Sequence, residues 1–491
     1  MTPFAQFLGL LPLATTVFAY NNICDTLNSQ IPDRVWYPRN QNYSASLSSY
    51  YTSFERQLDP SCIFRPTTTA EVVDFVNIIT ENASTTSSRP QFAIRGGGHT
   101  LFSAAANING SVTVDMRSMN SLTLSPDLKT ASIGAGAVFS DIYPQLTPYN
   151  LTVMGGRLPG IGAGGFTTGG GLNFLAREHG FSCDNIYGYE IVLANGTVIY
   201  ASASSHHDLW LALKGGSNNF GIITRFDLAA FPQGLMWGGV IMYNYTASTM
   251  AAQAKAFTNF MNPDHFDSAA EMAVLVNYED GGFTIGNSLF YTKPVAYPKV
   301  YQPFTSLPAP TFNDLSFNNV SGMVTKFGSF LPTSAERATE LVYSFHNANT
   351  TTYKQLIKIY QDGCALLNNI PGLLVQFMLQ PQPVTNGTNS LGLTPGETDL
   401  VIGLVSIAYD NPADDDRVFS VQEAIVDAQT ALLEEAGLLI PFKYLNYADV
   451  SQDPFGSYGE ENRERLREVS RRYDPLGVFQ WGVPGGFKLF D

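Results

Sequence analysis

At 491 residues the chain is long enough for two domains. Apolar residues make up 44% and charged residues only 14%, which is typical of a compact globular protein and excludes a disordered one. The net charge of −15 argues against a nucleic acid or an anionic membrane surface as partner, although acidity alone selects no substrate.

The N-terminus has the features of a secretory signal. Residues 1–19 are largely apolar and end in Val17-Phe18-Ala19, a sequence that suits signal peptidase. Because the run is short for a spanning helix, we favour a cleaved signal over a membrane anchor and expect a secreted protein with no membrane partner. Sequons for N-glycosylation fit this expectation and lie at Asn42, Asn82, Asn109, Asn150, Asn195, Asn244, Asn319, Asn349 and Asn386.

The cysteines fit an oxidising compartment. Cys24 and Cys62 can form a disulfide that tethers the N-terminal segment. Cys183 and Cys364 lie in apolar surroundings, which favours buried free thiols over a second disulfide. No cysteine spacing matches a zinc site, and we expect no metal.

The first predicted elements surround a glycine loop. Residues 20–60 predict an arm over the surface. A helix is predicted to begin near Thr68, because the Thr68 side chain can cap its first turn and the Glu71 side chain can bond back to the Thr68 backbone. A buried strand at residues 91–94 then leads into Arg95–Thr100, which reads RGGGHT. Its consecutive glycines let the backbone turn sharply and offer bare N–H groups to an anion such as a phosphate.

Two more glycine clusters lie at residues 155–171 and 214–216. The sequence contains no P-loop motif, which argues against a nucleotide hydrolase. Residues 160–165 resemble a dinucleotide-binding motif, but they follow no βαβ start and have no acidic residue placed for a ribose, which argues against a nicotinamide dehydrogenase. Loops spread from residue 95 to residue 216 instead suggest an extended dinucleotide across the domain, with His99 near its reactive end. Because Leu158, Ile161 and Phe166 are interleaved, we predict that residues 155–171 form a folded loop around a ligand, too glycine-rich for regular structure.

Between and after these loops the chain predicts short strands. They lie at residues 111–115, 131–133, 151–154 and 220–226, and residues 186–198 predict a hairpin turning at Asn195-Gly196. A helix is predicted from Ser205 to the stop at Gly215. Pro232-Gln233-Gly234 marks a plausible domain boundary.

The second half has a different character. Strands are predicted near residues 270–278, 283–291, 373–379 and 400–409, and amphipathic helices near 247–261, 335–346, 353–366 and 417–436. This pattern predicts an antiparallel sheet covered by helices. The last fifty residues contain Tyr444-Leu445-Asn446-Tyr447 and a charged helix that ends at Pro475.

Six motifs in order resemble a known family. They read RGGGHT, PGIGAGGFTTGGG, REHGFSCDNI, DLWLALKGGSNNFGIITRF, YLNYAD and YDPLGVF. Together they are similar to the berberine-bridge-enzyme-like branch of the vanillyl-alcohol-oxidase flavoproteins. The resemblance implies an α+β fold, with a PCMH-type FAD-binding domain of two α/β subdomains and a substrate domain. The implied ranges are 20–235 for the FAD domain, 236–442 for the substrate domain, and 443–491 for a segment that returns to the FAD domain.

The resemblance also implies the cofactor site. In the family the histidine of the first motif is bonded to the flavin 8α-methyl group, so His99 is expected to carry FAD covalently. Members with a second link place a cysteine before the proline of the second motif. Here Leu158 precedes Pro159, so we predict a single link. Further FAD contacts are expected at Arg95, Gly96, Gly97, Gly98, Thr100, Gly162, Gly164, Gly165, Thr168, Gly169, Gly170, Gly171, Asp184, Asn185, Gly221, Ile223, Tyr444 and Asn446.

The implied reaction is hydride transfer from a substrate carbon to flavin N5, with O2 as acceptor. Tyr447 is our first candidate for the base, and an orienting donor is the alternative role, since a tyrosine normally keeps its proton at neutral pH. Ile161 lies where the family controls access of O2, which favours an oxidase over a dehydrogenase. His179 is interpreted as structural, and Arg177 and Lys214 either face the flavin or make surface salt bridges.

The residues do not specify the substrate. We predict a small molecule, an alcohol, phenol or polyketide-like secondary metabolite, whose oxidation can include ring closure, and we expect a monomer. An oligosaccharide oxidase of the same family is the alternative. A catalytically inert flavin-carrying glycoprotein is the alternative from another class.

Overall fold

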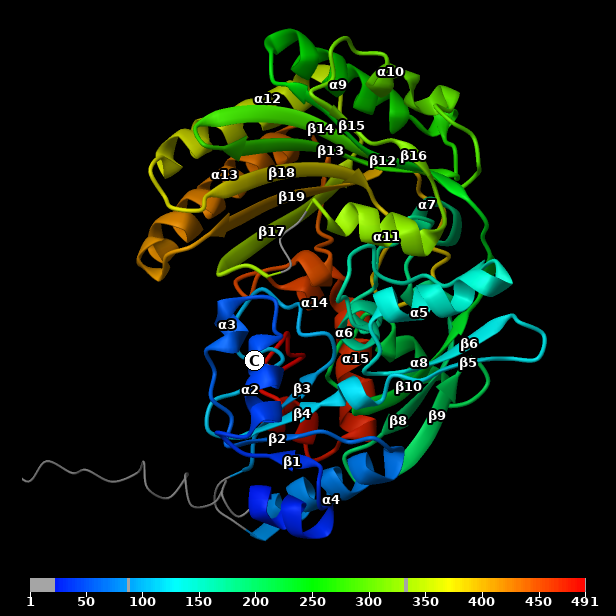
Figure 1. Cartoon of the computed structure of the whole chain (residues 1–491), viewed down its shortest axis with the longest axis vertical. Coiled ribbons are helices and arrows are strands. Elements are labelled where there is room, and N and C mark those ends of the chain that lie inside the picture. The colour runs from blue at the N-terminus through cyan, green and yellow to red at the C-terminus, as the bar shows by residue number, and fades with distance from the viewer. Residues whose placement is uncertain (1–22, 86–88, 331–333, 491) are drawn as a thin grey trace, which may run out of the picture.

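The computed structural model describes residues 23–85, 89–330 and 334–490, so the predicted signal at residues 1–19 lies outside the described residues. Figure 1 shows two stacked lobes. The N-terminal part of the chain and its C-terminal end share the lower lobe, and the green-to-orange middle part forms the upper lobe. The chain therefore leaves the lower lobe once and returns to it.

The lower lobe contains a small sheet at the N-terminal end. Its strands run in the order β1-β2-β4-β3, with β1 antiparallel to β2 and the other pairs parallel. Helix α4 (Thr69–Thr85) begins with the predicted capping exchange, because Glu71 N–H donates to Thr68 Oγ1 and Thr68 N–H donates to Glu71 Oε2. The elements here are β1 (Val35–Trp36), α2 (Gln41–Ser48), α3 (Ser53–Arg56), β2 (Cys62–Phe64), β3 (Phe92–Arg95) and β4 (Val112–Asp115).

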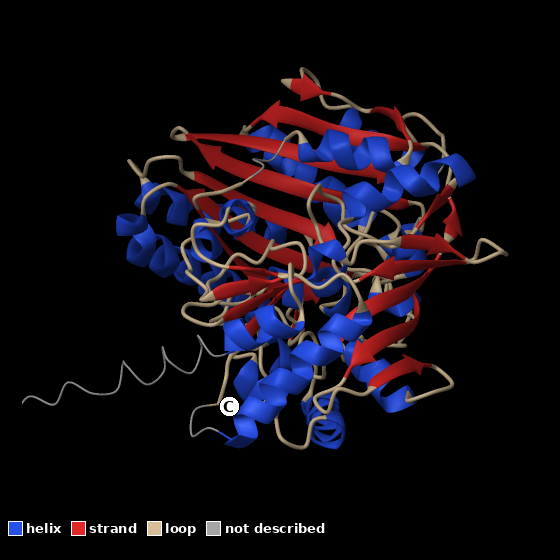
Figure 2. Ribbon diagram, turned by 60° about the horizontal axis from the view of Figure 1, so that its bottom comes forward, coloured by secondary structure: helices blue, strands red, loops and turns tan. Residues whose placement is uncertain are grey.

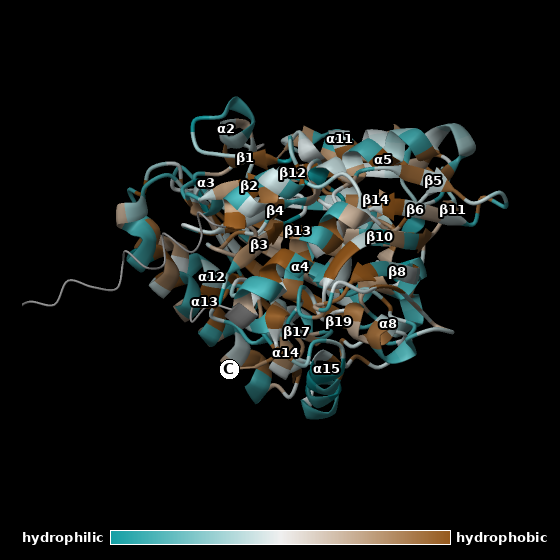
Figure 3. Cartoon of the chain, turned by 90° about the horizontal axis from the view of Figure 1, so that it is seen from below, coloured by the Kyte–Doolittle hydropathy of each residue, from teal (hydrophilic) through white to brown (hydrophobic). Residues whose placement is uncertain are grey.

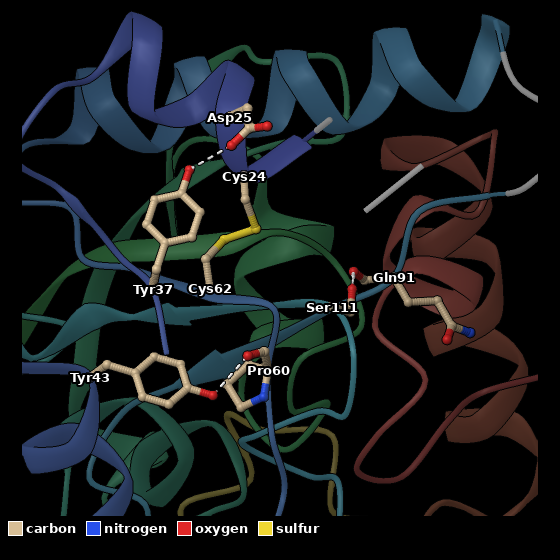
Figure 4. Close-up of a disulfide and its surroundings, with 8 residues drawn as sticks. All are labelled: Cys24, Asp25, Tyr37, Tyr43, Pro60, Cys62, Gln91 and Ser111. Atoms are coloured by element: carbon tan, nitrogen blue, oxygen red, sulfur yellow. Dashed lines mark hydrogen bonds between the residues drawn. A yellow bond between two sulfur atoms is a disulfide. The ribbon is translucent and has the colours of Figure 1, made fainter. Parts of the chain in front are cut away.

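The disulfide predicted between Cys24 and Cys62 is present (Figure 4). It links the segment before β1 to the first residue of β2. Near it, Tyr37 donates to Asp25 and Tyr43 donates to the carbonyl of Pro60. Cys183 and Cys364 are buried free thiols, as predicted.

A second, antiparallel sheet completes the lower lobe, in the order β5-β6-β10-β8-β9. The predicted hairpin joins β8 and β9, and Gly196 adopts φ +75° in its turn. Helix α15 packs against α8, where Arg472 and Tyr473 both donate to Asp208. The elements are β5 (Leu122–Leu124), β6 (Thr130–Gly134), α5 (Phe139–Leu146), β7 (Leu151–Thr152), α6 (Ala163–Thr168), α7 (Ala176–His179), β8 (Ile186–Val192), β9 (Val198–Ser202), α8 (His207–Leu213), β10 (Ile222–Ala229), β11 (Phe231–Pro232), α14 (Pro454–Ser457) and α15 (Glu460–Tyr473).

One antiparallel sheet of nine strands forms the upper lobe, in the order β15-β12-β14-β13-β18-β19-β17-β20, with β16 also paired to β12. Figure 1 shows α9, α10, α12 and α13 on the outer side of this sheet and the lower lobe on its other side, where α11 packs against α5 (Figure 2 shows the same sheet from a different direction). The strands are β12 (Met236–Asn244), β13 (Ala270–Glu279), β14 (Gly282–Tyr291), β15 (Phe312–Asn313), β16 (Ser316–Asn318), β17 (Arg337–His346), β18 (Leu374–Pro381), β19 (Leu400–Tyr409) and β20 (Leu439–Ile440). The helices are α9 (Ala247–Phe260), α10 (Gln302–Thr305), α11 (Val320–Gly328), α12 (Thr350–Cys364) and α13 (Asp415–Glu435).

The two faces of the large sheet belong to different cores. Leu341, Tyr343 and Phe345 of β17 pack with residues of α9, α12 and α13 in the upper core. Val342, between them in the strand, packs in the core of the lower lobe. Because neighbouring residues of a strand point to opposite faces, Glu340 and Ser344 also face the lower lobe. The hydropathy colours of Figure 3 show apolar strands inside and a polar α15 outside.

The antiparallel sheet covered by helices and the α+β fold are as predicted. The predicted helix at residues 335–346 is wrong, because these residues form β17, paired between β19 and β20. Nearly all of its residues are buried, because the two faces of the strand pack into different cores, and strand pairing overrides the helix preference of its Ala, Glu and Leu residues. Two smaller corrections concern residues 155–171, which contain α6, and residues 20–60, which contain α2 and α3 in place of a simple arm.

Among the described residues, no helix has the length and apolar content needed to span a membrane.

Candidate active site

The first two glycine loops touch each other through their backbones. A Cβ atom on Gly97 would lie 2.5 Å from the amide nitrogen of Gly162 and 2.6 Å from the carbonyl oxygen of Gly160. Real Cβ atoms do not approach backbone atoms so closely, and therefore only glycine fits at Gly97. Gly98 adds a φ of +76°, which lets the chain turn toward His99.

His99 ends this loop beside a second ring. Its imidazole stacks on Tyr51 with ring centroids 4.9 Å apart, and a Cβ on Gly160 would lie 2.5 Å from its Nε2. Burial, helped by the charge of Arg95, lowers the pKa of His99 to about 4. The imidazole is therefore neutral at physiological pH and keeps a lone pair, as a nucleophile needs.

A surface without side chains extends from His99. A Cβ on Gly165 would meet no atom within 4 Å, and one on Gly96 would find its nearest neighbours at 3.9 Å. The adjacent Gly97 and Gly164 leave the same stretch of backbone uncovered by side chains of their own. A cradle of this kind can receive a flat ring and a pyrophosphate, so these residues fit the expected FAD.

Arg95 has a different place from the one predicted. Its side chain is fully buried below the loop, where it donates to Ser46 and Ser49 and lies 3.5 Å from the ring centroid of Tyr50. The guanidinium therefore supports the loop from beneath and does not face the cradle. Lys214 and Arg177 are also buried, which corrects the expectation of surface salt bridges. Lys214 lies 3.7 Å from the Trp210 ring, and Arg177 lies between Phe260 and Phe266.

The C-terminal segment closes the glycine run. Tyr444 OH accepts from the Gly171 amide at 3.1 Å, and the Asn446 side-chain amide donates to the carbonyl of Phe166 at 2.9 Å. Asn446 approaches Gly169 so closely that a Cβ there would lie 2.1 Å from its Oδ1. These two predicted cofactor residues are thus brought together with the predicted glycines.

The other predicted cofactor residues mainly support the loops. Asp184 accepts from the Phe181 amide, Asn185 donates to the carbonyls of His179 and Phe181, and Thr168 donates to the carbonyl of Gly164. Gly221 and Ile223 lie at the start of β10, where a Cβ on Gly221 would lie 2.6 Å from the carbonyl of Val192. Gly170 has a positive φ, and Thr100 follows His99 in a partly exposed turn. His179 stacks on Phe231 at 4.0 Å, in agreement with a structural role.

Tyr447 faces a cation that the motifs do not reveal. Arg157 Nη2 donates to Tyr447 OH at 2.8 Å and to Gln380 Oε1 at 3.3 Å. Burial raises the pKa of Tyr447 even though Arg157 opposes the shift. The side chain is therefore a neutral phenol at physiological pH.

Above this group, two acidic residues lie on the sheet face that meets the lower lobe. Burial raises the pKa of Glu340 to about 8, against the opposing hydrogen bond from Ser406. The charge of Glu340 is close enough to perturb the pKa values of both Tyr51 and Tyr447. Burial likewise raises the pKa of Glu271 to about 8, opposed by Arg157 and Arg177.

Sequence reasoning missed Tyr51, Arg157, Gln380, Glu271 and Glu340. Glu271 is a fully buried acid in an otherwise mainly apolar part of β13, and Glu340 is a partly buried acid on the same face of the sheet, in β17. A charged residue at such a position is a signal for function, because burial of an acid is costly unless the site uses it. Tyr51 and Arg157 carry no comparable signal.

Comparisons with known proteins show the family to which the chain belongs. A family model described as FAD binding domain matches residues 60–202, and one described as Berberine and berberine like matches residues 443–482. The FAD-dependent monooxygenase tpcD of Cochliobolus heterostrophus is 34% identical over 480 residues, covering 94% of this chain and 91% of the relative. The FAD-dependent monooxygenase sdcF of Emericella nidulans is 35% identical over 490 residues, covering 95% and 98%.

Solved structures share the fold at low identity. A xylooligosaccharide oxidase from Myceliophthora thermophila, in complex with xylobiose, has a TM-score of 0.77 at 20% identity, covering 96% of this chain and 99% of that one. A single-residue variant of berberine bridge enzyme has a TM-score of 0.75 at 15% identity, covering 94% and 99%. From the curated relatives, the family models and the shared fold, the chain belongs to the berberine-bridge-enzyme-like family of FAD-dependent oxidoreductases.

Proposed function

We propose that the protein binds FAD covalently through His99 and oxidises an oxygenated aromatic or polyketide-like secondary metabolite, with O2 as the final acceptor. The observation that carries the proposal is the neutral imidazole of His99 at the end of a backbone cradle without side chains. Bound FAD supplies a two-electron acceptor that takes hydride from a substrate carbon and passes the electrons to O2, giving H2O2.

The chain's own groups then manage the substrate proton. Oxidation of an alcohol or phenol requires loss of the hydroxyl proton together with the hydride. With its raised pKa, Tyr447 is suited to orient the substrate oxygen by a hydrogen bond. Glu340, with a pKa of about 8, ionises at a lower pH than a tyrosine and can accept a proton once the pH approaches 8, so we propose Glu340 as the base and Tyr447 as the orienting residue.

The covalent link can be tested on purified, pigmented protein. We expect the yellow colour to stay with the precipitate after acid treatment, and mass spectrometry to find the flavin mass on the tryptic peptide that contains His99. The variant His99→Ala should release its flavin in acid, whereas the control His265→Ala, at an exposed position, should retain it. Acid-stable colour in His99→Ala would refute the attachment site.

Monooxygenation is the second candidate reaction, because the curated relatives tpcD and sdcF are named FAD-dependent monooxygenases. Such a reaction places one oxygen atom of O2 in the product and reduces the other to water, with the two electrons supplied through the flavin by a second, oxidisable site of the substrate or by a nicotinamide reductant. Turnover under ¹⁸O-labelled O2 separates the two candidates. Unlabelled product with equimolar H2O2 supports the oxidase, and labelled product supports the monooxygenase.

Two alternatives are less well supported. A related glucooligosaccharide oxidase is described with a 6-S-cysteinyl, 8α-N1-histidyl FAD, and this chain has Leu158 where the second link would require a cysteine. If the protein were an inert flavin carrier, Glu271 and Glu340 on the sheet face would have no role in a reaction. A substrate screen that follows anaerobic bleaching of the flavin tests both, since an inert carrier bleaches with no compound.

We also propose that the protein is secreted after cleavage near Ala19. The disulfide between Cys24 and Cys62 fits an oxidising compartment, and the sequon asparagines Asn42, Asn109 and Asn195 are exposed. N-terminal sequencing and an endoglycosidase mobility shift of the protein from the culture medium test this. An uncleaved, unglycosylated chain would refute it.

A further inference from the structure

Arg157 has an uncompensated charge beside the proposed reaction centre. Its Nη2 donates to Tyr447 and Gln380, which are both neutral. Among the residues that the structure describes, no carboxylate oxygen lies within 4.0 Å of its guanidinium. The side chain is only half-buried, so further N–H groups of the guanidinium remain available.

Behind Arg157, several deeply buried polar atoms have no partner. They are both carboxyl oxygens of Glu271, the side-chain nitrogen of Gln380 and both amide atoms of Gln382, in side chains no more than 3% exposed. A buried polar group without a hydrogen-bond partner destabilises the folded state. Most buried polar groups in proteins are hydrogen-bonded, and therefore such a concentration on one face indicates a place for a polar ligand.

The groups around this place are mainly donors, and their charge is positive. Arg157 is cationic, and the two glutamine amides can donate. The raised pKa of Glu271 keeps its carboxyl group neutral, and a donor, at physiological pH. Arg177 also acts on Glu271, but the nearby Asp267 offsets its charge, so Arg157 is the cation left to the site. A hydroxyl-rich neutral ligand would leave the charge of Arg157 unbalanced, whereas an anionic oxygen would balance it.

We infer that Arg157, Gln380 and Gln382 form a subsite for an anionic oxygen of the substrate, the carboxylate or phenolate of an acidic aromatic compound. The inference rests on the proposed function, because Tyr447 links this subsite to the reaction centre. It deepens that function by naming the charge class of the substrate and by giving Arg157 the role of a specificity-determining residue. A planar guanidinium is well suited to the role, since it binds carboxylates in a bidentate manner.

The test compares two probes that share a dihydroxyphenyl ring and differ in one group, which is a charged carboxylate in the first and its neutral methyl ester in the second. The holoenzyme is titrated with 2,4-dihydroxybenzoate and with its methyl ester, and binding is followed by the flavin difference spectrum and by calorimetry. We expect the anion to bind roughly ten- to hundred-fold more tightly, the range expected of a hydrogen bond to a charged group. Equal binding of the two probes would overturn the inference.

Variants of Arg157 test whether this residue causes the preference for the anionic probe. Arg157→Gln should reduce the preference to about two-fold, and Arg157→Lys should retain part of it. The control Arg472→Gln, on the exposed side of α15, should keep the full preference. Melting temperatures and flavin content identify variants that fail to fold. An unchanged preference in folded Arg157→Gln would overturn the assignment to Arg157.

The outcomes also separate this inference from the proposed function. A strong preference for the anion in a protein that bleaches with no substrate supports the subsite and refutes the oxidase. Turnover of a substrate without any preference for the anionic probe supports the oxidase and refutes the subsite.

Discussion

The cradle of the lower lobe and the polar face of the large sheet, the two halves of the proposed site, are built in different ways. The cradle is made of backbone, and its contacts exclude every side chain at Gly97 and Gly162. The face of the sheet is made of side chains such as Glu271, Glu340 and Gln380, each carried on a different strand and flanked by residues that point to the opposite face. The comparison teaches that a site held by backbone leaves a motif in the sequence, whereas a site held on strands leaves isolated polar residues.

The largest expected effect is on the cradle. Gly97→Ala should abolish flavin incorporation and destabilise the fold by about 3–5 kcal/mol, because the added methyl group would collide with backbone atoms 2.5 Å away. Flavin content and urea denaturation measure the two effects. The control is Gly234→Ala, whose added Cβ would meet nothing within 4 Å and should leave both unchanged. Normal flavin content in Gly97→Ala would show that the loops can separate.

The next effect is on the sheet face. Glu340→Gln should lower kcat roughly 10²- to 10³-fold, the range of general-base catalysis, and leave flavin content intact. In the parent protein, activity should rise with pH through about 8, because a base must lose its proton first. Tyr447→Phe should cost about ten-fold and keep that pH dependence. If Tyr447→Phe removes the pH dependence and Glu340→Gln does not, the tyrosine is the base.

The pH dependence of stability gives an intermediate effect. The pKa of Glu271 is raised from 4.5 to about 8, so the folded state holds this proton more tightly than the unfolded chain. The contribution of Glu271 is therefore fully present below pH 4.5 and is lost as the pH rises through 8. Glu271→Gln should flatten this decline by about 1–3 kcal/mol, measured by denaturation between pH 5 and 8.5. The control Glu423→Gln, at an exposed position on α13, should keep the decline.

The smallest effect contrasts two buried serines. Ser46 bonds to Asp115 and accepts from Arg95 in the lower lobe, so Ser46→Ala should cost about 1–3 kcal/mol. Ser344 is buried on the sheet face with no partner for its hydroxyl, and Ser344→Ala should change stability by less than about 0.5 kcal/mol. Thermal denaturation measures both. Equal costs would show that the hydroxyl of Ser344 has a partner in solution.

Much of the fold could be predicted where a structural element depends only on residues that are close together in the sequence. The capping exchange of Thr68 and Glu71 and the turn at Asn195-Gly196 are local, and both are present. The residues of β17 were predicted as helix because strand pairing is a long-range effect. The place of the predicted domain boundaries, at residues 235 and 442, stays a prediction.

The site was predictable to a similar degree. His99 and the glycines could be found because their spacing follows from backbone contacts. Whether FAD is attached to His99 stays a prediction. The sequence identified Arg95 as part of the first glycine loop, but it did not predict that the side chain packs against Tyr50 below the loop, because a side chain of this length can reach either side of the loop. Tyr51 and Arg157 could not be found, because their partners come from distant parts of the chain.

The bonds of Tyr444 and Asn446 to the glycine run have a consequence for biosynthesis. Tyr444 lies 273 residues after Gly171, and Asn446 lies 280 residues after Phe166. The nascent chain therefore presents its glycine run without these two bonds until the large sheet has been synthesised, and a protein cut short before residue 444 never gains them.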